Sequence, residues 1–377
     1  MKIKYKLHYN VIRYLNFCVI WILVTLIYFL PLFFIYNTVN NTNYSLCIWL
    51  SITILIAFSL GILDGIFNFV FIQRFFQKIN FILLFILKTF FYILSYFLTA
   101  IILIIFSGLL SFLIGINSYN IIIGNELKTF FQSELLYQFG AFIIILSFTV
   151  NFLIQINSKL GPNILINVFL EKYRTPKLEK KILLFLDIAK STTIAEKIGA
   201  FQFSALLQDF FRDIDIAITN NWGQIYKFVG DEVIITWNVE DGINNKKCIQ
   251  FFFDAKKNIY KNKDKYMSKY GVFPEFKAGL HIGNVIITEI GVSKQEITYY
   301  GDTVNTTARI RSMCNEKGKE FLISAQLLSY LPDLDEKYNV EAIGVLRLKG
   351  KANVIGLFSI EDRFDITNME LNDLNNY

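Results

Sequence analysis

Residues 181–188 read KILLFLDI and residues 224–237 read QIYKFVGDEVIITW, and these two stretches decide the fold of the second half of the chain. The first is an apolar run typical of a buried strand, and it ends near Asp187. The second contains two strand-like runs about Gly230-Asp231, which is typical of a hairpin. If the strands are adjacent, Asp187 and Asp231 meet and can bind metal; otherwise Asp231 merely suits the turn.

Helical and strand-like patterns alternate around these two stretches. Residues 193–196 (TIAE) have the spacing of a capping box and predict a helix start, and further helices are predicted at 201–220 and 242–270. Strands are predicted at 275–283, 284–290 and 297–300, and a helix at 303–316. The order β-α-β-β-α-β predicts a ferredoxin-like α+β core.

The first half of the chain has the composition of a membrane domain. The chain is 54% hydrophobic, and up to residue 156 it has only eight Lys/Arg and three Asp/Glu. A membrane span needs about 20 apolar residues. The sequence therefore predicts an all-α membrane domain over 1–156, with four transmembrane helices near 14–36, 45–70, 89–115 and 137–156. A linker with a short helix is expected at 157–180.

Basic residues predict how this membrane domain is oriented. They occur before the first span, between the second and third spans, and after the fourth, whereas the first connection has no charge. By the positive-inside rule both termini and the second half of the chain are cytosolic, in a multi-pass protein of the cell inner (plasma) membrane. Asp64 is the only acidic residue inside a span; a sensing role is possible, and a protonated or polar-interior side chain is favoured.

The charges of the second half limit its partners. Beyond residue 156 there are 29 basic and 28 acidic residues, so no broad basic surface for nucleic acid is expected. The Lys-rich stretch 256–269 is interpreted as a solvated helix face. The four cysteines have no paired spacing, and the polar tail 362–377 is assigned no role.

A third motif, TYYGDTVNTTAR at residues 298–309, makes the pattern specific. With FLDI at 185–188 and KFVGD at 227–231, it resembles the catalytic domain of class III nucleotidyl cyclases over residues 181–361. The resemblance implies that Asp187, Asp231 and the carbonyl of Ile188 bind two divalent metal ions, Mg²⁺ or Mn²⁺. It also implies a phosphoryl transfer from ATP or GTP.

The same resemblance assigns the substrate contacts. Lys227 and Thr298 match the base-selecting pair, and here they favour adenine because a Lys ammonium donates to the unprotonated adenine N1. Asn305 matches the ribose-positioning residue and Arg309 the transition-state residue. The residues expected to bind phosphate are Ser191, Thr192, Lys294 and Lys349. The sequence departs from the family at the loop after Asp187, which lacks the usual aromatic residue, and at Ala352, where Gly is common.

The resemblance therefore predicts a membrane-anchored adenylate cyclase that makes cyclic AMP and acts as a homodimer. Each site would take Asp187 and Asp231 from one subunit, and from its partner it would take Lys227, Thr298, Asn305, Arg309 and Lys349. The sequence leaves four alternatives open. They are a guanylate cyclase, a diguanylate cyclase, a transporter, and a non-catalytic nucleotide-binding membrane receptor with a retired cyclase domain.

Overall fold

The computed structural model describes residues 170–347 and 354–363, together with scattered residues between 22 and 168. The chain divides into two compact units, residues 1–159 and 160–377. In the first unit the described positions are helical. Among the residues that are described, no helix combines the length and the apolar character that a bilayer span requires. The four spans predicted from the sequence fall almost entirely outside the described residues, so they stay predictions.

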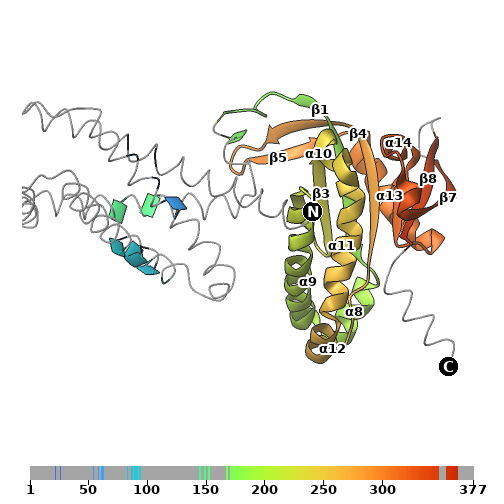
Figure 1. Cartoon of the computed structure of the whole chain (residues 1–377), viewed down its shortest axis with the longest axis horizontal. Helices are drawn as coiled ribbons and strands as arrows, with labels where there is room; N and C mark the ends of the chain where they lie inside the picture. Colours follow the sequence, from blue (N-terminus) through green and yellow to red (C-terminus); the bar gives the residue numbers. More distant parts are fainter. Residues whose placement is uncertain are drawn as a thin grey trace, which may run out of the picture. The chain divides into compact units, whose positions relative to one another are not determined.

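The second unit is built on one mixed sheet of eight strands (Figure 1). The strands run in the order β2-β3-β1-β4-β6-β8-β7, and β5 pairs with β4. Their bounds are β1 Lys177–Ile188, β2 Gln224–Val229, β3 Glu232–Asn238, β4 Phe276–Ile290, β5 Glu296–Tyr300, β6 Phe321–Ser324, β7 Tyr338–Arg347 and β8 Val354–Asp362. The antiparallel order β2-β3-β1-β4 is that of a ferredoxin-like core, so this part of the predicted fold is confirmed.

Helices connect these strands. Their bounds are α8 Ser191–Ile198, α9 Ala200–Asn220, α10 Val239–Ile243, α11 Lys247–Lys261, α12 Lys263–Tyr270, α13 Asp302–Lys317 and α14 Ala325–Leu328. Short 3₁₀ turns lie at Asn244–Lys246 and Leu334–Glu336. In Figure 1 α9 and α11 run side by side along the sheet.

Alternate residues of β1 enter two different environments. Ile182, Leu184 and Leu186 belong to the main core, which also contains apolar residues of α9 and α11. Leu183 lies on the opposite face, where it packs with Tyr173 and with residues of β4. Because side chains alternate along a strand, Asp187 lies on the same face as Leu183. The face that carries chemistry is therefore the one that α9 and α11 leave uncovered.

Three sequence predictions differ from the observed elements. Helix α8 begins at Ser191 after a left-handed Lys190 that makes no side-chain cap, so the capping box predicted at 193–196 is wrong. The helix predicted at 242–270 is broken into α10, α11 and α12, with left-handed residues at Asn245 and Lys246. The two strands predicted at 275–290 form one continuous strand, β4. Local pattern identifies the type of these elements better than their limits.

Two glycines of β4 bring α13 unusually close to the sheet. A Cβ at Gly279 would overlap the backbone of Arg311, and one at Gly283 would overlap the Thr303 side chain. The Thr303 hydroxyl donates to the carbonyl oxygen of Asn284 at 2.6 Å, which fastens the start of the helix to the strand. The position of every side chain on α13 therefore depends on these two glycines.

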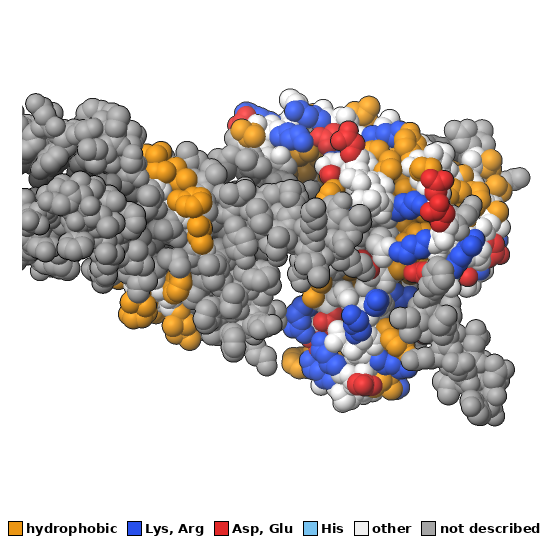
Figure 2. Space-filling view, in the orientation of Figure 1, with side chains coloured by type: hydrophobic (Ala, Val, Ile, Leu, Met, Phe, Trp, Pro, Cys, Tyr) orange, Lys and Arg blue, Asp and Glu red, His pale blue; other side chains and the backbone are white. Residues whose placement is uncertain are grey.

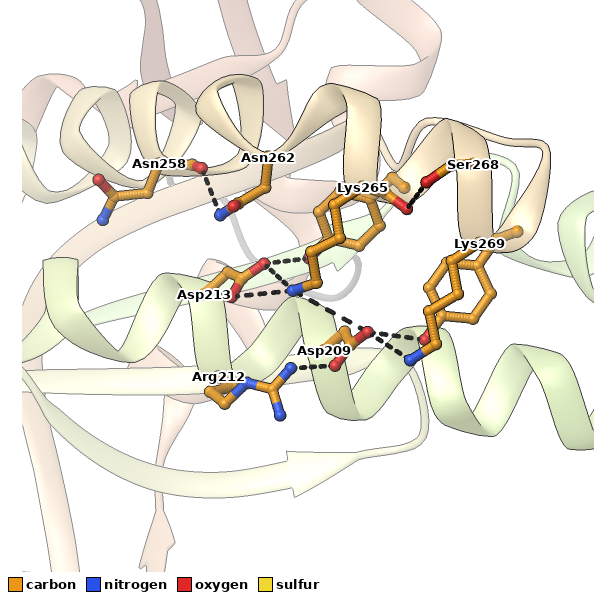
Figure 3. Close-up of polar contacts among 10 residues, drawn as sticks. Asp209, Arg212, Asp213, Asn258, Asn262, Lys265, Ser268 and Lys269 are labelled. Atoms are coloured by element: carbon orange, nitrogen blue, oxygen red, sulfur yellow. Dashed lines mark hydrogen bonds and ion pairs between the residues drawn. The ribbon is translucent and has the colours of Figure 1, made fainter. Parts of the chain in front are cut away.

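Helix α12 is held to α9 by charged and phenolic groups (Figure 3). Lys269 and the Tyr270 hydroxyl both donate to Asp209, at 2.9 and 2.8 Å. Lys265 contacts Asp213 at 3.1 Å. Lys269 is exposed and Lys265 is partly exposed, as expected for a solvated helix face, and both also face carboxylates of α9 that lie far away in the sequence.

Replacing Gly279 by Ala is expected to destabilise the protein by about 1–3 kcal/mol, because the added methyl group meets backbone that cannot rotate away. Gly283→Ala meets a side chain instead, so adding Thr303→Ala is expected to recover part of its loss. Chemical unfolding of the full-length protein would measure both. Equal stability of Gly279→Ala and wild type would contradict the close approach of α13.

Candidate active site

Three carboxylates meet where β1 ends and β3 begins. Asp187 is the next-to-last residue of β1, and Glu232, the first residue of β3, is its cross-strand partner. Asp231 lies in the turn that joins β2 to β3. The Asp187 and Asp231 carboxyl groups are close enough to share a hydrogen bond. The structure thus brings together the two aspartates that the sequence singled out.

Burial and like charge act on these carboxyl groups together. The pKa of Asp187 is raised to about 7, mainly by burial and then by the hydrogen bond to Asp231, while Arg311 opposes the shift. Burial also raises the pKa of Glu232, again opposed by Arg311. Two carboxyl groups this close favour a shared proton unless a cation joins them. The pair is therefore suited to bind a divalent cation.

The oxygen donors present fit a metal ion whose remaining coordination positions are filled by other ligands. No cluster of three or more His, Cys, Asp or Glu suitable for a metal occurs in the part of the chain that the structure describes. Two carboxylates and the carbonyl at Ile188, the last residue of β1, leave several coordination positions open. Mg²⁺ is commonly bound by one or two carboxylates together with water and substrate phosphates. The donor set matches that mode of binding.

Arg311 is a residue of the site that the sequence reasoning missed. Its Nη1 donates to Oδ2 of Asp187 at 2.8 Å, and its Nη2 forms an ion pair with Oε2 of Glu232 at 2.8 Å. The second contact is not an aligned hydrogen bond, since Glu232 Oε2 has no hydrogen-bond partner among the described residues. The sequence shows only a second arginine two positions after Arg309. The direction of its side chain depends on how α13 is oriented on the sheet.

Strand β5 folds back across the sheet and meets β2. The rings of Tyr226 and Tyr299 stack with centroids 4.2 Å apart, and the Tyr299 amide donates to the Tyr226 hydroxyl at 3.0 Å. Two strands separate β2 from β4 in the sheet, so the β4–β5 hairpin must cross its face. This crossing brings the two predicted base-selecting strands together.

Lys227 and Thr298 lie on these two facing strands. The Lys227 ammonium forms an ion pair with Glu296 at 2.6 Å, and this contact raises the pKa of Lys227. Glu296 stands two residues before Thr298 on β5, and the sequence reasoning had not singled it out. The Thr298 hydroxyl is buried and has no hydrogen-bond partner in the described part of the chain. It can therefore serve a ligand.

Asn305 and Arg309 both lie on α13, away from the sheet. Asn305 is exposed and Arg309 is partly exposed, whereas Thr307 and Cys314 are buried. Residues two apart on a helix point about 200° apart. Arg309 therefore faces away from the side on which Arg311 reaches Asp187.

The predicted phosphate-binding residues are scattered in the single chain. Ser191 and Thr192 open α8, directly after β1. Lys294 is exposed in the β4–β5 connection, which follows the end of β4 remote from the Asp187–Lys277 pair. Within one chain the structure does not bring Lys294 to the carboxylates. Lys349 lies outside the described residues.

His281 has a structural role. His281 is buried on β4, where Nδ1 lies 2.8 Å from the Ser324 hydroxyl, and burial lowers its pKa to about 4. It is a core side chain. On the visible face of the second unit, Figure 2 shows basic and acidic side chains interspersed. The absence of a nucleic-acid partner stays a prediction.

Comparisons with known proteins agree on the family of the second unit. Residues 174–361 match the sequence model of the family described as "Adenylate and Guanylate cyclase catalytic domain". Adenylate cyclase 2 of Rhizobium meliloti (strain 1021) is 34% identical over 202 residues, which are 53% of this chain and 55% of that one. Receptor-type guanylate cyclase gcy-13 of Caenorhabditis elegans is 24% identical over 176 residues, 46% of this chain and 17% of that one.

A solved structure shows the same fold. A bacterial light-regulated adenylyl cyclase has a TM-score of 0.51 and 18% identity, and the match covers 63% of this chain and 69% of that one. The chain spans about half the length of the Rhizobium relative and less of the nematode one. The residues that match the family model, 174–361, lie within the second unit.

The pKa of Asp187 makes the stability of the metal-free protein depend on pH. Since the folded-state pKa of about 7 exceeds the ordinary value of 3.8, stability falls as pH rises between these values. Asp187→Asn should therefore raise the melting temperature, relative to wild type, more at pH 8 than at pH 5. Thermal unfolding in EDTA would measure this difference.

Asp209→Asn provides a control of opposite sign. Burial raises the pKa of Asp209, but hydrogen bonds from Lys269 and Tyr270 outweigh it, so the pKa is lowered overall. The loss of stability caused by this variant should be the same at pH 5 and pH 8 and should shrink only as the pH falls below the ordinary value of 3.8. If the effect of Asp187→Asn on the melting temperature did not depend on pH, this would contradict the raised pKa of Asp187.

Proposed function

Because residues 174–361 belong to the family of adenylate and guanylate cyclase catalytic domains, we propose that the chain is a membrane-anchored adenylate cyclase. It converts ATP to 3′,5′-cyclic AMP and pyrophosphate. The observation that carries the proposal is the Asp187–Asp231 pair on the open face of the sheet, together with Lys227 and Thr298 on facing strands. The 34% identity to a bacterial adenylate cyclase supports the choice of reaction.

In the proposed reaction the ribose 3′-hydroxyl gives up its proton to water, and its oxygen bonds to the α-phosphorus while the bond to pyrophosphate breaks. Asp187, Asp231 and the Ile188 carbonyl would hold two divalent ions, Mg²⁺ or Mn²⁺. When bound, such ions lower the pKa of the attacking hydroxyl and neutralise the leaving group. Arg309 offsets the negative charge that develops on the α-phosphoryl oxygens, and Asn305 orients the ribose. Positioning and charge supply the catalysis, without a covalent intermediate.

The base is read by Lys227 and Thr298. The Lys227 ammonium donates to adenine N1. The corresponding guanine nitrogen carries a hydrogen and is itself a donor, so it cannot accept a hydrogen bond from the ammonium. The unpartnered Thr298 hydroxyl accepts from the adenine amino group. Glu296, already paired with Lys227, keeps the ammonium near β5.

The direction of the side chains on α13 supports the proposed homodimer. Arg311 reaches the carboxylates of its own chain, and Arg309 points to the other side of the helix. A site that needs both Asp187 and Arg309 is therefore completed by a second copy. Phe228 and Val229, beside Asp231 at the β2–β3 turn, are exposed apolar side chains suited to that contact. Ser191, Thr192, Lys294 and Lys349 would bind the phosphates in the assembled site.

The four predicted spans would anchor the enzyme in the cell inner (plasma) membrane, with both termini and the catalytic domain cytosolic, where ATP is. This part of the proposal rests on the apolar composition of residues 1–156 and on the positive-inside rule. A guanylate cyclase is the second candidate, because the family includes both activities. A retired, nucleotide-binding receptor is disfavoured by the intact pair of aspartates.

Purified full-length protein given equal ATP and GTP with Mg²⁺ or Mn²⁺ is expected to make cyclic AMP, measured by chromatography. Asp231→Asn should lose nearly all activity, because one of the two metal-binding carboxylates is gone. Asp241→Asn, on α10, is the control and should retain activity. Cyclic GMP as the main product would contradict the roles of Lys227 and Thr298.

Complementation tests whether two chains share each site. Asp187→Ala and Arg309→Ala should each be inactive alone, yet an equal mixture should recover about a quarter of wild-type activity. The reason is that half of randomly paired dimers are mixed and each mixed dimer has one intact site of two. The two variants would be co-expressed, and the cyclase activity per dimer would be compared with that of wild type. An inactive mixture that contains mixed dimers would overturn the shared site.

A further inference from the structure

Arg311 joins two strands at the point where the proposed metal site is built. Its two terminal nitrogens lie 2.8 Å from Asp187 Oδ2 on β1 and 2.8 Å from Glu232 Oε2 on β3. The three side chains are largely buried, with exposed fractions of 25%, 20% and 13% for Arg311, Asp187 and Glu232. Ion pairs removed from water in this way are much less screened than surface pairs.

The backbone places Arg311 there with little freedom. A Cβ on Gly279 would overlap the nitrogen and Cα of Arg311, so the helix backbone rests directly on β4 at this residue. Cys314, one turn further on, is buried and contacts the Ala278 carbonyl. The guanidinium therefore projects from a fixed point across β4 to the ends of β1 and β3.

The neighbouring lysine does not compete for this role. Lys277 is the cross-strand partner of Asp187, but its ammonium donates to Asn315 on α13 at 3.0 Å. Arg311 engages Oδ2, one of the two carboxylate oxygens of Asp187, and so restricts the rotation of that carboxylate. A planar guanidinium can hold two carboxylates in fixed directions, which a lysine ammonium cannot do.

We propose that Arg311 is a positioning residue of the metal site, which holds Asp187 against Glu232 in the orientation that a divalent ion requires. The inference rests on the proposed function in that Asp187 and Asp231 are taken as metal ligands. Arg311 acts through Asp187 and touches neither the ion nor ATP. Groups that hold metal ligands in place contribute strongly to affinity, and their loss typically weakens metal binding about 10–100-fold.

The test is Mn²⁺ binding by the full-length protein without nucleotide, followed by electron paramagnetic resonance of the free ion. Arg311→Met should weaken binding about 10-fold or more. Arg311→Lys keeps the charge but reaches one carboxylate at a time, so it should recover part of the affinity. Arg309→Met is the matched control on the same helix: it should bind Mn²⁺ as wild type does and lose cyclase activity.

A kinetic readout separates positioning from a general loss of structure. For Arg311→Met the Mn²⁺ concentration that gives half-maximal activity should rise by the same factor as the binding constant, while KM for ATP at saturating Mn²⁺ stays near wild type. Arg311→Met could fail to fold because it leaves buried charge unpaired. In that case a double variant, Arg311→Met with Glu232→Gln, removes both charges of the Arg311–Glu232 ion pair. This double variant retains Asp187 and Asp231 and should show the same weakened binding.

Wild-type affinity in Arg311→Met or in the double variant would overturn the proposal. Tighter binding would overturn it as well, since Arg311 would then be a competitor of the ion. Absence of Mn²⁺ binding by wild type would also overturn it. If wild type binds Mn²⁺ and Arg311→Met weakens that binding, but no cyclic nucleotide forms, the inference stands and the proposed reaction fails.

Discussion

The close packing of α13 on β4 is the constraint on which the site depends. Gly279 faces Arg311 and Gly283 faces Thr303, eight residues apart on α13, and at both places a Cβ atom would hold the helix away from the sheet. With the helix at this distance, Arg311 reaches Asp187 on β1 and Glu232 on β3. The Thr303 hydroxyl also reaches the carbonyl oxygen of Asn284. A helix displaced by one side-chain thickness would lose both contacts.

This packing divides the helix into two sides with different tasks. The side turned to the sheet carries Thr307, Arg311 and Cys314, and the outer side carries Asn305 and Arg309. The electrostatics differ accordingly, because Arg311 is committed to charges of its own chain. The arrangement explains how one short motif can hold a chain's own carboxylates and, in the proposed dimer, contact the substrate bound at the carboxylates of a second copy.

The opposite face of the sheet has a purely structural role. The aromatic and aliphatic side chains of α9 and α11 cover it, and α12 is joined to α9 by Asp209, Asp213 and their basic and phenolic partners. A rigid backing of this kind holds β1 and β3 in register, and the register sets Asp187 beside Glu232. Stability and site geometry are thus linked through the strands they share.

Strand periodicity and a Gly-Asp turn are local signals, so the α+β order of the second unit and the two candidate aspartates could be read from the sequence. That Asp187 and Asp231 meet depended on the pairing of β1 with β3, which the tertiary structure shows. Only the tertiary structure decided where α8 begins, that β4 is continuous, and that Arg311 and Glu296 join the site. Those contacts cross between strands and helices far apart in the chain. Their geometry depends on helix direction and on sheet curvature, which no local pattern encodes.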